Sequence, residues 1–263
     1  MDRLRGGHWQ RAEDELADEV PVALEYNGIS HAVMLATPAD LEAFALGFSL
    51  SEGIIGAAAD CYGIEIAPRE NGIAVQLRIG NEAFLRLKQR RRNLAGRTGC
   101  GLCGAESLDQ VLRAPPPLAP GRALSASAIR GALTGLSARQ PLNRLTGGVH
   151  AAAWCAPDGE LLAVFEDVGR HNALDKLIGA MARAGRDFRD GFVLMSSRAS
   201  VELVQKSATV GITALVAISA PTALAVRTAQ ACGMTLVAFA RGDDFVAYAH
   251  GEHIQLDQGP KRA

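Results

Sequence analysis

The chain has 263 residues, of which 48% are hydrophobic and 21% charged, and its formal net charge is −1. This length allows one large domain or two small ones, and the small charge excludes bulk attraction to nucleic acid or an anionic membrane. We expect a cytoplasmic protein, because no apolar stretch approaches the roughly 20 residues that cross a bilayer and residues 1–10 lack the apolar core of a secretory signal.

The first hundred residues predict a small α+β unit. Apolar runs at 20–26 and 29–35 flank Asn27-Gly28, a typical β-hairpin turn. Thr37 and Pro38 predict a helix start, with Thr37 as the cap and Pro38 at the first helical position. Alternating apolar residues at 73–79 predict a half-buried strand, and a helix is expected to follow from Asn81 toward Leu94.

A Cys-x-x-Cys loop, formed by Cys100 and Cys103 among three glycines, is the most informative segment of the chain. The glycines make the backbone permissive. A run of cations precedes the loop, and nearby positive charge favours the thiolate, which is the nucleophilic form of cysteine. The sequence therefore predicts a reactive or sulfur-carrying thiol. The cations of this run are Lys88, Arg90, Arg91, Arg92 and Arg97.

Three other interpretations of the loop stay open at this point. A zinc knuckle would need two further ligands, and the chain has no second Cys-x-x-Cys. A thioredoxin-like dithiol should open a helix directly after a strand, whereas this loop follows a predicted helix. The third alternative is an inert buried pair. The isolated residues Cys61, Cys155 and Cys232 are expected to be buried structural thiols.

A proline-rich run at 114–121 is the best candidate for a linker, because it can continue neither a helix nor a central strand. We therefore predict an N-terminal domain over 1–113, a linker over 114–124 and a second domain over 125–263. In the second domain, apolar runs typical of strands at 149–155, 160–165, 192–195, 212–218 and 234–239 alternate with helical segments. This order predicts an α/β domain with a mixed, partly parallel sheet and flanking helices.

Short polar segments, which we call polar corners, follow several of the predicted strands. Ser197 and Arg198 follow one strand, Arg241 follows another, and Arg170 and His171 begin a helix. Ligands of open α/β sheets bind outside the carboxyl ends of the strands, and helix starts favour anions. These corners therefore predict a crevice for phosphate or carboxylate groups.

The order of elements also resembles that of cytidine deaminases. Those enzymes need a His or Cys with a nearby Glu on one helix start and Pro-Cys-x-x-Cys on the next. Here Asn172 and Ala173 follow His171, and Arg198 and Ala199 stand where the cysteines would be. We therefore expect a deaminase-like fold with no structural metal and without deaminase chemistry.

An ordered set of segments across residues 19–248 resembles the formate dehydrogenase accessory sulfurtransferases, the FdhD family. The segments are Glu19-Val20-Pro21-Val22-Ala23-Leu24, Phe44-Ala45-Leu46-Gly47-Phe48-Ser49-Leu50-Ser51-Glu52-Gly53-Ile54-Ile55, Gly96-Arg97-Thr98-Gly99-Cys100-Gly101-Leu102-Cys103-Gly104, His150-Ala151-Ala152-Ala153-Trp154, Glu166-Asp167-Val168-Gly169-Arg170-His171 and Ser196-Ser197-Arg198-Ala199-Ser200. The resemblance implies a dimeric sulfur carrier with a deaminase-like C-terminal part. Such a carrier takes sulfur from an L-cysteine desulfurase as a cysteine persulfide. It passes the sulfur to the molybdenum bis(molybdopterin guanine dinucleotide) cofactor, which then enters the formate dehydrogenase apoprotein.

The resemblance also assigns roles to residues. It implies that Cys100 carries the persulfide and that Cys103 is its companion. The family's cofactor-binding segment corresponds to Phe239, Ala240, Arg241, Gly242, Asp243 and Asp244. Asp243 and Asp244 make this segment more acidic than the family pattern. A nucleotide-binding regulator with a Cys-x-x-Cys redox switch and a thiol oxidoreductase remain the competing functions.

Overall fold

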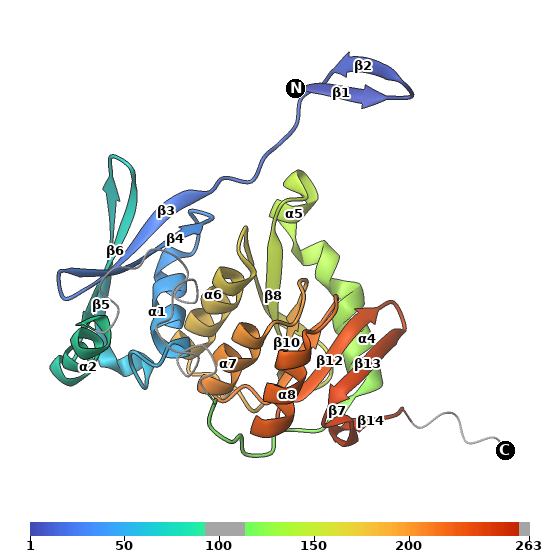
Figure 1. Ribbon diagram of the computed structural model, residues 1–263. Helices are drawn as coiled ribbons and strands as arrows, with labels where there is room; N and C mark the ends of the chain where they lie inside the picture. Colours follow the sequence, from blue (N-terminus) through green and yellow to red (C-terminus); the bar gives the residue numbers. More distant parts are fainter. Residues whose placement is uncertain (93–113, 258–263) are drawn as a thin grey trace.

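A computed structural model describes residues 1–92 and 114–257 of the chain (Figure 1). The Cys-x-x-Cys loop with Cys100 and Cys103 lies outside the described residues. No helix in the described part is long and apolar enough to span a membrane.

The N-terminus forms a separate two-stranded hairpin that projects from the rest of the molecule (Figure 1). Its antiparallel strands are β1 (Asp2–Arg5) and β2 (His8–Arg11), and every residue in them is exposed. Trp9 and Leu4 face each other in the register and are 72% and 58% exposed. The hairpin therefore contributes no side chain to the protein core.

A four-stranded sheet with order β4-β3-β6-β5 follows. Its strands are β3 (Val20–Tyr26), β4 (Ile29–Ala36), β5 (Cys61–Arg69) and β6 (Gly72–Ile79), with helices α1 (Leu41–Ser51), η1 (Ala58–Asp60) and α2 (Asn81–Arg92). The predicted hairpin around Asn27-Gly28, the strand after Gly72 and the helix from Asn81 are confirmed. Strand β5 was not predicted.

The predicted cap of α1 is wrong. The helix begins at Leu41 after Asp40, which has φ 54°, and no side chain caps it. Thr37 instead receives a hydrogen bond on Oγ1 from the backbone N–H of Val168, 3.2 Å away. Its hydroxyl is therefore engaged with a residue far along the chain rather than with the helix start.

The second half of the chain builds a six-stranded mixed sheet with order β13-β12-β11-β10-β8-β9. Strands β10, β11 and β12 are parallel to one another, and the other neighbouring pairs are antiparallel. This confirms the predicted mixed, partly parallel sheet. The strands are β8 (His150–Cys155), β9 (Leu161–Asp167), β10 (Phe192–Met195), β11 (Ala214–Ala217), β12 (Thr235–Arg241) and β13 (Asp244–Ala249).

Helices cover both faces of this sheet, as the alternation of side chains along its strands requires. Val193 and Met195 face the core beneath α6 (Arg170–Arg183), α7 (Val201–Thr209) and α8 (Ala223–Cys232). Leu194 and Phe192 face α4 (Ala126–Leu136) on the other side. The remaining short elements are β7 (Leu124–Ser125), η2 (Ser137–Arg139), α5 (Pro141–Thr146), η3 (Gly251–His253) and β14 (Ile254–Gln255).

One continuous core joins the two halves, because residues of β3, α1 and β6 belong to the same buried cluster as residues of α6, α7 and the large sheet. Helices α1 and α6 approach very closely at Gly47 and Gly179. A Cβ at Gly47 would overlap the backbone carbonyl of Asp175, and one at Gly179 would overlap that of Ala43. The division at 114–124 remains a prediction; residues 114–123 have no regular structure.

Candidate functional site

One edge of the large sheet gathers the polar corners expected from the sequence. The parallel strands β10, β11 and β12 end there, β9 ends there, and the antiparallel β8 begins there. We call this the polar edge. Its residues are His150 and the segments 167–171, 196–200, 218–222 and 239–244. With neighbouring strands about 4.8 Å apart, the edge extends roughly 19 Å from β12 to β9.

Asp167 builds the corner that carries Arg170 and His171. Its Oδ1 accepts hydrogen bonds from the backbone N–H of Gly169 (2.8 Å) and from Nδ2 of Asn172 (2.9 Å). This local turn lets α6 begin at Arg170, directly after the extended residue Gly169. Arg170 and His171 therefore lie in the first turn of α6, where the helix dipole favours anions.

The corner after β10 is held by two hydrogen bonds between Ser196 and Ala151. The N–H of Ser196 donates to the carbonyl of Ala151 at 3.0 Å, and Ser196 Oγ accepts from the N–H of Ala151 at 2.7 Å. Ser197 is buried, and its hydroxyl donates to the carbonyl of Arg198 at 3.1 Å. Arg198 is exposed. Of this pair, Arg198 is thus the side chain available to a ligand.

Arg170 and Arg198 create a positive potential around His150. Burial lowers the pKa of His150, and the two arginines lower it further. Burial also lowers the pKa of His171 to about 4, with Arg170 as the next cause. Both imidazoles are therefore neutral near pH 7, while the guanidinium groups stay charged. Within the described residues, Arg170 Nε and His171 Nε2 are buried without a hydrogen-bond partner.

The segment 239–244 lies farther along the same edge and differs from the expectation. It was predicted to follow the last central strand, but β12 continues through Arg241, and Asp244 begins β13. Phe239 has φ 52° and is 43% exposed, so its ring stands out of the strand. Arg241 Nε donates to the carbonyl of Ile218 at 3.1 Å. The fixed Arg241 thus bounds the polar edge on the β12 side, while Gly242 and Asp243 form the exposed turn to β13.

His150 is the functional candidate that sequence reasoning missed. A histidine at the start of a strand gives little signal by itself. Its place becomes informative only once β8 is known to run antiparallel to β10, because the start of β8 then lies beside the end of β10.

The isolated cysteines do not form a thiol site. Cys155 and Cys232 are buried, as predicted, whereas Cys61 is only half-buried. Burial raises the pKa of all three thiols, which disfavours the reactive thiolate. Among the described residues, no three His, Cys, Asp or Glu side chains gather closely enough to hold a metal ion.

Comparison with known proteins places the chain in a well-defined group. The family model described as FdhD/NarQ matches residues 17–255. The protein named sulfur carrier protein FdhD from Cupriavidus necator is 58% identical over 255 residues, which cover 97% of this chain and 88% of that protein. Its namesake from Bordetella petrii is 54% identical, with 97% of this chain and 92% of that protein covered.

A solved structure has the same fold. A protein from Desulfotalea psychrophila, described as a candidate formate dehydrogenase accessory protein, superposes with a TM-score of 0.74. The match covers 97% of both chains at 24% sequence identity.

Proposed function

The chain belongs to the FdhD/NarQ family, and from this membership we propose that it is a sulfur carrier for formate dehydrogenase. It accepts sulfur from an L-cysteine desulfurase on Cys100 and passes it to the molybdenum of the bis(molybdopterin guanine dinucleotide) cofactor. The observation that carries the proposal is 58% identity, over 97% of the chain, to a protein named as a sulfur carrier.

The loading step is a thiol–persulfide exchange. The Cys100 thiolate attacks the terminal sulfur of the donor's persulfide and forms a new S–S bond. The donor's own S–S bond breaks, and its cysteine leaves as a thiolate, so no external oxidant is needed. The basic run that ends α2 supports this role, because positive charge stabilises the attacking thiolate.

Cys103 supports the release step. Its thiolate attacks Sγ of Cys100 and forms a Cys100–Cys103 disulfide. The outer sulfur leaves as hydrosulfide, and its sulfur is already at the oxidation level of a sulfide ligand on molybdenum. The two electrons come from the dithiol, and a cellular dithiol reductant restores the pair. The molybdenum cofactor is the substrate of this step.

The polar edge is the proposed holding site for the cofactor. Arg170 and Arg198, with Ser197 and His171 beside them, form the phosphate-binding part. Phe239, Ala240, Arg241, Gly242, Asp243 and Asp244 form the part for the guanine nucleotide. The buried, unpartnered nitrogens of Arg170 and His171 support this assignment, since buried polar atoms normally have partners.

We also propose a cytidine-deaminase-like architecture for residues 125–263 and a homodimeric assembly. The strand order β9-β8-β10-β11-β12, with α6 and α7 connecting successive strands, supports the first assignment. The positions that would bind zinc in a deaminase carry Asn172, Ala173, Arg198 and Ala199, so we propose no structural metal.

The test of the sulfur-carrier role is mass spectrometry after incubation with an L-cysteine desulfurase and L-cysteine. We expect an adduct of one sulfur atom on Cys100, lost in Cys100→Ala and retained in the matched control Cys61→Ala. An intramolecular disulfide without any sulfur adduct would instead support a redox switch or a thiol oxidoreductase.

Nucleotide binding is tested separately by calorimetry with GDP and ADP. We expect wild-type protein to prefer GDP. Arg198→Ala and Arg241→Ala should each weaken GDP binding by roughly tenfold or more, because each removes a charge-assisted contact. Arg227→Ala, on the exposed surface of α8, is the matched control. Equal binding of GDP and ADP would contradict the assignment of the polar edge.

A further inference from the structure

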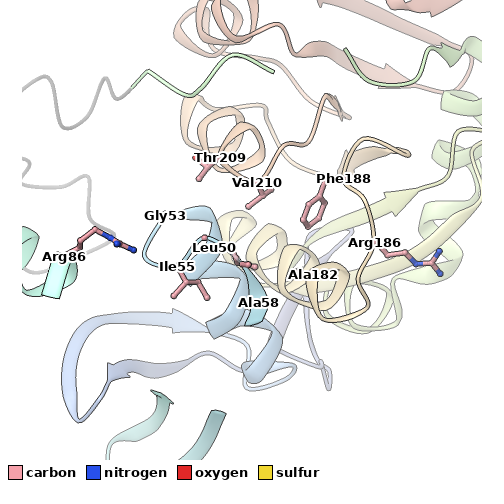
Figure 2. A pocket seen from close by; sticks show the side chains of 12 residues that line it. Leu50, Gly53, Ile55, Ala58, Arg86, Ala182, Arg186, Phe188, Thr209 and Val210 are labelled. Carbon is pink, nitrogen blue, oxygen red and sulfur yellow. The ribbon is translucent and has the colours of Figure 1, made fainter. Parts of the chain in front are cut away.

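A cavity of about 480 Å³ lies where α1, α6 and α7 end (Figure 2). Leu50 and Ile55 line one side of it, and Phe188 and Val210 line another. Arg86 of α2 reaches toward it from the side of Gly53, while Arg186 points outward (Figure 2). The volume is in the range of ordinary ligand pockets.

This cavity is separate from the polar edge. Ala182 lines it near the end of α6, whereas Arg170 and His171 lie at the beginning of the same helix. A helix of 14 residues is roughly 20 Å long, so the two sites lie at opposite ends of α6. A molecule held at the polar edge would leave the cavity free.

Three of the polar groups in the wall have partners within the protein. The N–H groups of Gly56 and Ala57 both donate to Oδ2 of Asp60, at 3.0 and 2.9 Å. The hydroxyl of Thr209 donates to the carbonyl of Gln205 at 2.8 Å. The wall therefore combines apolar side chains with polar groups and with the guanidinium groups of Arg86 and Arg186. This combination suits an apolar side chain with acidic neighbours.

The charge of α2 favours the same kind of ligand. The helix carries Arg86, Lys88 and Arg90–92 against the single acid Glu82. Arg86 pairs with Glu82, but both side chains are largely exposed, at 49% and 90%, so the pair is easily exchanged for another carboxylate. A basic helix beside a partly apolar cavity attracts an acidic protein segment and speeds its encounter.

We propose that this cavity receives an apolar side chain from an acidic segment of the protein that donates sulfur. The inference rests on the proposed function and adds the docking site. Cys100 follows Arg92 by eight positions, so it can be no farther than roughly 28 Å from the end of α2. A donor seated on α2 and in the cavity would therefore lie within reach of the acceptor thiol.

The experiment measures sulfur transfer from an L-cysteine desulfurase with radiolabelled L-cysteine. Arg86→Glu reverses the charge at the rim, and Ala58→Trp fills the cavity. Both should raise the KM for the desulfurase by roughly tenfold or more, with little change in kcat. Arg86→Lys should keep the wild-type KM. Arg69→Glu, an exposed charge reversal at the end of β5, is the matched control.

Loading with inorganic polysulfide separates docking from chemistry, because polysulfide needs no docking surface. All variants should accept sulfur from it as the wild type does. Unchanged KM values in Arg86→Glu and Ala58→Trp would overturn the docking site while leaving the sulfur-carrier role intact. A change of oligomeric state in Ala58→Trp, seen by light scattering, would mean that a second copy occupies the cavity and would also overturn it. If the desulfurase did not load even the wild type, the proposed function and this inference would fail together.

Discussion

Lys176 and Asp167 form a fully buried ion pair, with Lys176 Nζ 2.7 Å from Asp167 Oδ2 and both side chains 0% exposed. The pair joins the two halves of the chain. Lys176 Nζ also donates to the carbonyl of Thr37 at 3.1 Å, and Asp167 Oδ2 accepts from the N–H of Thr37 at 3.1 Å. Because Asp167 also shapes the start of α6, this pair fixes the polar edge relative to α1.

Lys176→Met should therefore destabilise the protein by about 3–5 kcal/mol, because it leaves the buried Asp167 carboxylate without its cation. The measurement is the free energy of unfolding from urea titration. Arg189→Met, which breaks the exposed pair with Asp187, is the control and should leave the urea midpoint unchanged. Equal midpoints for wild type and Lys176→Met would show that the pair is not needed.

The close contact between α1 and α6 depends on the lack of a side chain at Gly47 and Gly179. Gly179→Ala should destabilise the protein by about 3 kcal/mol or more, since the new methyl group would overlap the backbone of Ala43. Gly131→Ala, at an exposed position of α4 with no atom within 4 Å of the added carbon, should stabilise it by about 0.5–1 kcal/mol. Thermal unfolding of both variants tests the pair of expectations. Similar melting temperatures for the two would contradict close helix packing.

Local sequence signals predicted most of the fold. The Asn27-Gly28 turn led to the first hairpin of the N-terminal sheet, and the alternation of apolar runs with helices led to the mixed sheet. The role of Thr37 could not be predicted, because its partners Asp167 and Val168 lie about 130 positions away. Strand β5 was missed because Gly63 and Pro68 interrupt its pattern, which an edge strand tolerates.

The candidate site was predictable only where it depends on strand ends. Arg170 and Arg198 follow strands in the sequence and Arg241 ends one, and the sheet brings them to one edge. The cavity beside Arg86 could not be predicted, because its lining comes from four separate stretches of chain that only the packing of α1 against α6 and α7 assembles.

The N-terminal hairpin should be dispensable for stability. Removal of residues 1–12 should change the free energy of unfolding by less than about 0.5 kcal/mol, because β1 and β2 are wholly exposed and an isolated hairpin is marginal in water. Removal of 1–26 is the contrasting variant, since it also deletes β3 with its buried Val22, Leu24 and Tyr26 and should prevent folding. A clear loss of stability on removal of 1–12 would reveal an intramolecular role for the hairpin.

We expect the loss of folding stability at acidic pH to come mainly from His171. Its pKa, lowered to about 4 mainly by burial, is below the ordinary 6.5, so the folded state disfavours protonation. Its contribution to stability is therefore complete above pH 6.5 and is lost as the pH falls toward 4. The loss can reach on the order of 3 kcal/mol. In His171→Gln, the free energy of unfolding should depend less on pH across this window than in the wild type.

Asp175 should affect the pH dependence of stability in the opposite direction and therefore serves as a control. Burial raises its pKa to about 6, against the lowering effect of Lys206, so the folded state binds this proton more readily than the unfolded chain. Its contribution is present at low pH and is lost as the pH rises from about 4 through 6, which partly masks the effect of His171. Asp175→Asn removes the masking and should steepen the loss of stability on acidification, even though it also weakens the contact with Lys206 and lowers stability at every pH. The unfolding curves of both variants, recorded from pH 4 to 7, decide the assignment: if His171→Gln kept the wild-type slope, another group would have to carry the acid response.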